Sequence, residues 1–136
     1  MDLKYPTVRQ TFKALLVSMF IFSTTISSPA LGQSLTLQSP NGGEIWPYGG
    51  AEVVTWTGQD LSSYVDIYIS YNGGSTWYYL GEVPGGPNGG SSYLLVPYNT
   101  TENALLRITD AFYTSASDQS DEHFTIFLPS ISITEP

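Results

Sequence analysis

Residues 64–80 read Tyr-Val-Asp-Ile-Tyr-Ile-Ser-Tyr-Asn-Gly-Gly-Ser-Thr-Trp-Tyr-Tyr-Leu, and this stretch decides the fold. Val65, Ile67 and Ile69 recur at every second position, which is the period of a half-buried β-strand. Residues 72–74 tolerate the positive φ angles of a short hairpin turn, and residues 75–80 resume as an aromatic return strand. A hairpin alone is marginally stable in water, so the sequence predicts further strands that cover it.

Further strands are predicted on both sides of this hairpin. They are residues 33–38, 44–47, 52–57, 91–96, 105–110 and 123–127, and turns rich in Pro, Gly, Asn and Ser separate them. Trp56 is expected at the centre of the core, with Leu106 and Ile108 also pointing inward. Residues 81–90 contain five glycines and two prolines and are predicted to form a long surface loop. Without a helical period, the pattern indicates an all-β, antiparallel β-sandwich of seven or eight strands.

Residues 1–32 are predicted to be a helical signal peptide. Three basic residues precede an apolar run at 14–26, and residues 30–32 (Ala-Leu-Gly) fit a cleavage site before Gln33. The alternative is an uncleaved membrane anchor, but the run is shorter than the roughly 20 apolar residues that a span needs. The expected location is therefore outside the cell or on its surface, with the β-sandwich formed by residues 33–128.

Residues 129–136 form a separate tail. The segment 130–136 (Ser-Ile-Ser-Ile-Thr-Glu-Pro) has the same pattern as residues 34–40 (Ser-Leu-Thr-Leu-Gln-Ser-Pro). Two interpretations are open: the first strand of a second, truncated repeat, or a plain extended tail.

The charge balance excludes several classes of partner. After residue 32 the chain has eleven acidic residues and a single basic one, Arg107, which gives a net charge of −10. Phosphate contacts need Lys and Arg, so nucleic acid is excluded, as is an anionic membrane once the leader is cleaved. Because the chain contains no cysteine, disulfides and thiolate metal sites are excluded as well. The acidity suits a soluble extracellular protein or one that binds cations.

Several segments together resemble a known family. They are residues 39–46 (Ser-Pro-Asn-Gly-Gly-Glu-Ile-Trp, which includes Trp46), 54–56 (Val-Thr-Trp), 93–97 and 107–110 (Arg-Ile-Thr-Asp). They look like the N-terminal domain shared by yeast cell-wall synthesis proteins and Ser/Thr-rich GPI-anchored wall proteins, a domain with secreted bacterial members. The resemblance covers nearly all of residues 34–127. It implies an immunoglobulin-like or fibronectin-III-like extracellular module without a defined active site, in a wall, surface or polysaccharide setting. The chain lacks the Ser/Thr-rich stalk and the C-terminal anchor signal of the wall proteins, which puts anchoring in doubt.

Residues 70–77 also resemble the Asp-box, Ser-x-Asp-x-Gly-x-Thr-Trp, with Asn72 in place of Asp. In sialidase-like propellers this hairpin has a structural use, and one copy does not make a propeller. A structural role is therefore expected for Ser70, Asn72, Gly74, Thr76 and Trp77. Asn72 is expected to accept N–H groups of the turn while Trp77 packs over the hairpin.

The acidic residues around the predicted loop 111–121 suggest a calcium site. Asp110, Asp118 and Asp121 supply the hard oxygen ligands that calcium prefers, although the Asp-x-Asp-x-Asp-Gly loop is absent. The alternative is an ordinary acidic loop. No catalytic residue is predicted, since the single histidine, His123, stands without a serine-elbow motif or a His-x-x-His spacing.

The tyrosines offer a second kind of site. On the hairpin, Tyr68 and Tyr78 are expected to share an outward face with Tyr71 nearby, while Trp77 and Tyr79 turn inward. Exposed rings on a rigid sheet stack on sugars, although tyrosine also favours half-buried strand positions for no functional reason. The sequence therefore predicts a non-catalytic secreted module with a structural, adhesion or cell-surface role. The alternative is a carbohydrate-binding module, and the expected partners are a polysaccharide or other copies of the module.

Overall fold

A computed structural model describes residues 32–136, so the predicted signal peptide lies almost wholly outside the described residues. The described chain forms nine strands: β1 (Ser34–Ser39), β2 (Ile45–Pro47), β3 (Ala51–Gln59), β4 (Tyr64–Ser70), β5 (Tyr78–Pro84), β6 (Gly89–Leu95), β7 (Thr101–Asp110), β8 (Ser117–Gln119) and β9 (Phe124–Phe127). In this part of the chain no helix is long and apolar enough to cross a membrane.

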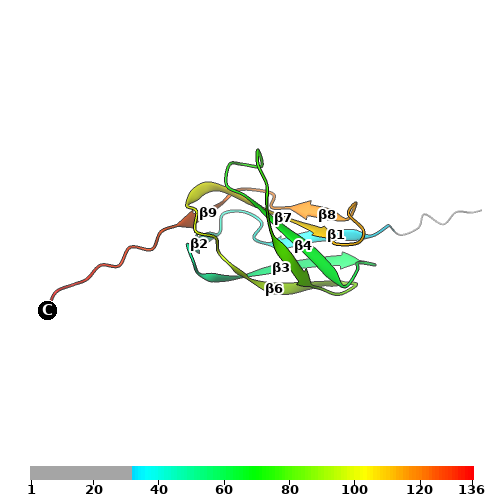
Figure 1. The fold of residues 1–136 in the computed structure, drawn as a ribbon, viewed down its shortest axis with the longest axis horizontal. Coiled ribbons are helices and arrows are strands. Elements are labelled where there is room, and N and C mark those ends of the chain that lie inside the picture. Colours follow the sequence, from blue (N-terminus) through cyan, green and yellow to red (C-terminus); the bar gives the residue numbers. More distant parts are fainter. Residues whose placement is uncertain (1–31) are drawn as a thin grey trace, which may run out of the picture.

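The strands form two sheets, as Figure 1 shows. One has the order β1-β3-β6 and the other β2-β9-β7-β4-β5, with β8 beside β7. The predicted all-β sandwich is confirmed. The prediction of a purely antiparallel fold was wrong, because β2 runs parallel to β9. The strand number was also low, because β8 forms inside the segment that we expected to be a loop.

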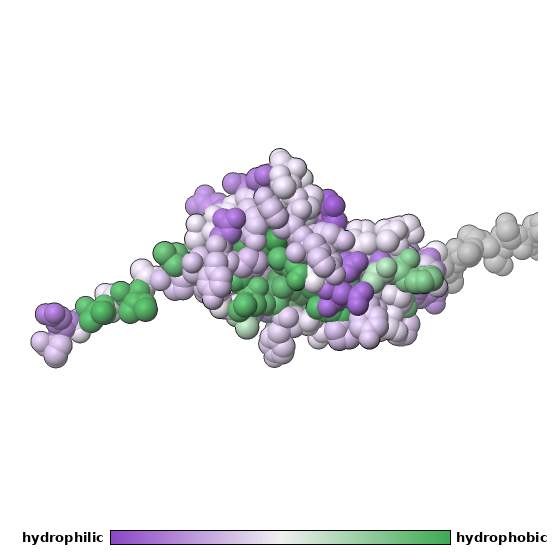
Figure 2. All heavy atoms as spheres, in the orientation of Figure 1, coloured by the Kyte–Doolittle hydropathy of each residue, from purple (hydrophilic) through white to green (hydrophobic). Residues whose placement is uncertain are grey.

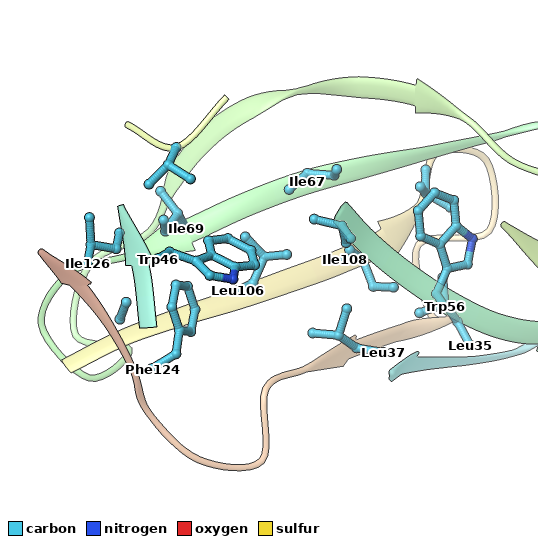
Figure 3. Packing of buried hydrophobic residues seen from close by; sticks show 14 of the residues in the cluster. Leu35, Leu37, Trp46, Trp56, Ile67, Ile69, Leu106, Ile108, Phe124 and Ile126 are labelled. Carbon is cyan, nitrogen blue, oxygen red and sulfur yellow. The ribbon is translucent and has the colours of Figure 1, made fainter. Parts of the chain in front are cut away.

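The core lies between the two sheets (Figure 3). Val65, Ile67 and Ile69 all point into it, as their spacing predicted. Trp46 packs against Phe124 with ring centroids 4.7 Å apart. Each large apolar side chain buried in this way stabilises the fold by about 1.5–3 kcal/mol.

The packing of Trp56 explains why glycines follow β5. Its indole is buried, and a Cβ atom placed on Gly90 would lie 2.9 Å from Trp56 Cζ2. The glycines therefore allow the indole to pack against the backbone. The prediction of a loop over residues 81–90 was wrong at both ends: β5 continues to Pro84 and β6 begins at Gly89. Pro84 is tolerated because β5 is an edge strand.

The turn between β4 and β5 contains the hydrogen bonds that its motif predicted. Asn72 Oδ1 accepts from the Ser70 hydroxyl at 3.0 Å and from the Thr76 N–H at 2.9 Å. Ser70 Oγ accepts in turn from the Gly74 N–H at 2.8 Å. The Ser70 side chain is fully buried, so these bonds fix the turn to the sheet.

The Asn72→Ala substitution tests this network. We expect it to lower the free energy of unfolding by about 1–2 kcal/mol, because the hydroxyl of Ser70 and the N–H of Thr76 lose their shared acceptor. Asn72→Asp retains an oxygen at that position and is expected to cost less than about 0.5 kcal/mol. Urea unfolding measures both, and equal losses in the two variants would contradict the role given to the oxygen.

Candidate functional site

The outer face of the second sheet has a row of side chains that crosses four strands. Unbroken pairing of β4 with β7 places Tyr68 opposite Arg107, and β8 adds Gln119 opposite Arg107. On the other side, Tyr79 of β5 is opposite Tyr68. Adjacent strands are about 4.8 Å apart, so the row Tyr79–Tyr68–Arg107–Gln119 spans roughly 14 Å.

A second row runs beside the first and is polar throughout. The same pairings align Glu82, Asp66, Thr109 and Ser117 across the four strands. The hydroxyls of Thr109 and Ser117 are 3.0 Å apart and hydrogen-bonded. We call the two rows together the tyrosine face. It combines aromatic rings with carboxylate, hydroxyl and amide groups at regular spacing.

The two tyrosines form a fixed pair. Their ring centroids lie 5.3 Å apart with the planes tilted by 56°, and the Tyr79 hydroxyl donates to Asp66 Oδ1 at 3.1 Å. Partial desolvation, this hydrogen bond and the negative charge of Asp66 raise the pKa of Tyr79. The phenol therefore remains a protonated donor at neutral pH.

Arg107, a member of the first row, stacks on Trp77, which lies just before β5. The guanidinium carbon of Arg107 lies 3.8 Å from the centroid of the Trp77 ring, a cation–π contact. Arg107 also donates to Gln119 Oε1 at 3.4 Å. The prediction that Trp77 turns inward was therefore wrong, because its ring lies with Arg107 on the outer side of the sheet.

The expected pairing of Tyr68 with Tyr78 was also wrong, and a β-bulge is the reason. The pairing of β4 with β5 shifts register after Ile67, which is opposite Gly81, a glycine with a φ of 144°. Beyond the shift, Tyr79 faces outward beside Tyr68, and it is 57% exposed. Tyr78 instead lies against Tyr71, with ring centroids 5.5 Å apart.

Of the three tyrosines predicted to bind a ligand, only Tyr68 belongs to the tyrosine face. Tyr71 is half-buried against the core, and desolvation raises its pKa. Sequence reasoning missed the part played by Tyr79. The glycine that follows Leu80 is the sequence signal that points to a bulge.

The three carboxylates predicted as calcium ligands serve separate contacts. Asp110 accepts from the backbone N–H groups of Ser62, Phe112 and Tyr113 at 2.6, 2.9 and 2.7 Å. Asp118 Oδ2 accepts from the Leu37 N–H at 2.8 Å, and Asp121 Oδ2 accepts from the Asn41 amide at 2.8 Å. Within residues 32–136, no three Asp, Glu or His side chains gather where they would hold one metal ion.

Two shallow hollows flank these features. One, of about 520 Å³, is lined by Gln119, Asp121, Glu122 and His123, and it continues the tyrosine face past β8. The other, of about 690 Å³, lies between the loops at one end of the sandwich and is lined by Tyr64, Phe112 and Tyr113 among others.

Comparison with known proteins adds no assignment. The chain matches no protein-family model and no curated protein sequence.

Asp110 makes the stability of the protein depend on pH. Burial by itself raises the pKa of this carboxyl, but the N–H donors of Tyr113, Ser62 and Phe112 outweigh burial and hold the pKa below its ordinary value. A depressed pKa in the folded state contributes stability above the unfolded pKa of about 3.9, and this contribution is lost as the pH falls through the folded value.

Asp110→Asn is therefore expected to lower the free energy of unfolding by about 2 kcal/mol near neutral pH, with a smaller loss in strong acid. Urea unfolding at several pH values measures the difference from the wild type. Glu135→Gln removes the same charge from the exposed tail and serves as the control. A loss that stayed constant down to about pH 2 would contradict the ionised role of Asp110.

Proposed function

We propose that this chain is a non-catalytic, secreted β-sandwich module with a structural or adhesion role at a cell surface or in an extracellular matrix. The observation that carries the proposal is the placement of the two ends. The chain enters β1 at one pole of the sandwich and leaves β9 at the opposite pole (Figure 1). Modules joined in series along a fibre or a stalk have this geometry.

Three further features support the proposal. The strand order, in which β5 pairs with β4 and β6 moves to the other sheet, suits an immunoglobulin-like or fibronectin-III-like module. Of the three acidic residues predicted as calcium ligands, Asp110 and Asp118 accept backbone N–H groups, and Asp121 accepts the side-chain amide of Asn41. The leader pattern and the resemblance to wall-protein domains both favour a position outside the cell.

Fractionation of cells that express the full chain tests this proposal. We expect the protein in the medium or the wall fraction, with a mass that corresponds to a chain beginning at Gln33. Gly32→Pro places a proline at the predicted cleavage site and is expected to block processing. A wild-type chain retained in the cytosol with residues 1–32 intact would contradict the proposal.

The tyrosine face favours a second function, recognition of an uncharged polysaccharide. Tyr68 and Tyr79 offer ring surface for the C–H faces of sugars, and Asp66 and Gln119 lie beside them as partners for sugar hydroxyls. The net charge of −10 after the leader disfavours an acidic polymer. A row of roughly 14 Å suits an oligosaccharide stretch of a polymer more than a single sugar.

Affinity electrophoresis through gels that contain uncharged wall polysaccharides tests this second function. We expect one polymer to retard the wild type, and Tyr68→Ala combined with Tyr79→Ala to reduce the affinity about tenfold, since stacking contributes about 0.5–1.5 kcal/mol per ring and about 1.4 kcal/mol is a factor of ten. The matched control combines Tyr98→Ala with Tyr113→Ala, two exposed tyrosines that lie in loops outside the tyrosine face. Equal losses in the two double variants would contradict the assignment, as would unretarded migration of the wild type through every polymer.

A further inference from the structure

From Ser91 onward strand β6 has one edge without a partner, since only Gly89 at its start is bridged, to Gly86. It pairs with β3 without a register shift, and on its other side no strand of residues 32–136 pairs with it. Val96, which follows β6, directs both its N–H and its C=O toward the β3 side, at 2.7 Å to Gly50 O and 3.1 Å from Gly49 N. Because this direction alternates along an antiparallel strand, Ser91, Tyr93 and Leu95 point their backbone groups outward.

The other strand edges in the described part of the chain are protected. β5 has a bulge at Gly81 and ends at Pro84. β1 is covered by β8, whose Asp118 accepts the N–H of Leu37. β2 is three residues long and ends at Pro47. Bulges, prolines and short length are the usual devices against strand addition, and β6 has none of them.

The segment that contains β6 is also free of charge, although the chain is strongly acidic. Residues 83–101 contain no Asp, Glu, Lys or Arg. Three apolar side chains stand exposed on the outer side of this sheet: Tyr93 (79%), Leu95 (62%) and Val53 (41%). In Figure 2 apolar side chains reach the surface over the part of the molecule where Figure 1 places β6. Two acidic copies repel each other least at such a surface.

We propose that β6 pairs antiparallel with β6 of a second copy of this chain, about a two-fold axis at Tyr93. This register places Tyr93 opposite Tyr93 of the second copy and Ser91 opposite Leu95, so these three outward-pointing residues of β6 find partners, while the backbone of Gly89 is already bonded to Gly86 of its own chain. The two three-stranded sheets join into one. The two Tyr93 rings become cross-strand neighbours beside Leu95. The proposal does not depend on whether the tyrosine face binds a polysaccharide.

The register makes a prediction about cross-linking in a chain that has no cysteine of its own. Hydrogen-bonded neighbours on antiparallel strands have Cα atoms about 5.5 Å apart, within the span of a disulfide. Tyr93→Cys is therefore expected to form a disulfide-linked dimer at least about tenfold faster than Leu95→Cys, because the two Leu95 positions are about 13 Å apart in this register. Equal rates for the two variants would overturn the pairing about Tyr93.

Sedimentation equilibrium of the purified protein, from about 1 µM to about 1 mM, tests the dimer itself. We expect the wild type to associate reversibly to a dimer, more tightly as salt screens the net negative charge. Tyr93→Lys places two like charges opposite each other and is expected to raise Kd at least about tenfold.

Phe112→Lys is the matched control, since Phe112 is also exposed (76%), lies in a loop away from β6, and undergoes the same change of charge. It is expected to leave Kd within about twofold of the wild type. A wild type that remains monomeric up to about 1 mM would overturn the proposal, and so would a dimer that Tyr93→Lys does not weaken.

Discussion

The structure depends on the unbroken pairing of β4 with β7. This pairing places Ile67 opposite Ile108 on the core side and Tyr68 opposite Arg107 on the outer side. Since side chains alternate, a slip of one residue would move the isoleucines into water and the arginine into the core. The hydrophobic core therefore fixes the outer face as well: burying one set of side chains presents the other set in rows.

The edge strands β5 and β6 determine two surfaces of this sandwich. The bulge at Gly81 turns Tyr79 toward Tyr68, and the same bulge protects β5 from strand addition. β6, on the other sheet, keeps an unguarded edge beside exposed Tyr93 and Leu95. The two edge strands therefore differ in what they expose. Strand β5 contributes side chains to the tyrosine face, and β6 exposes unpaired backbone groups.

Some of the acidic residues of this chain bond to its own backbone. Asp110 ties the segment before β4 to the loop after β7, and Asp118 ties β8 to β1. Bonds of this kind need ionised carboxylates but no basic partner. They explain how a chain with one basic residue after position 32 has order in the loops that join its strands. Arg107, that one residue, stacks on Trp77.

Short stretches of the sequence determine much of this fold. The two-residue alternation determined which side chains of β4 and β7 point inward, and the hairpin motif determined the bonds of Asn72, because both act over a few neighbouring residues. Only the tertiary structure decided the phase of β5, since the bulge depends on its pairing with β4. The tertiary structure also explains the glycines after β5. They allow Trp56, which is distant in sequence, to pack against the backbone. Asp110 shows the same division. The sequence shows an acidic residue at this position, but its N–H partners Ser62 and Tyr113 come close to it only when the strands assemble into the sheet.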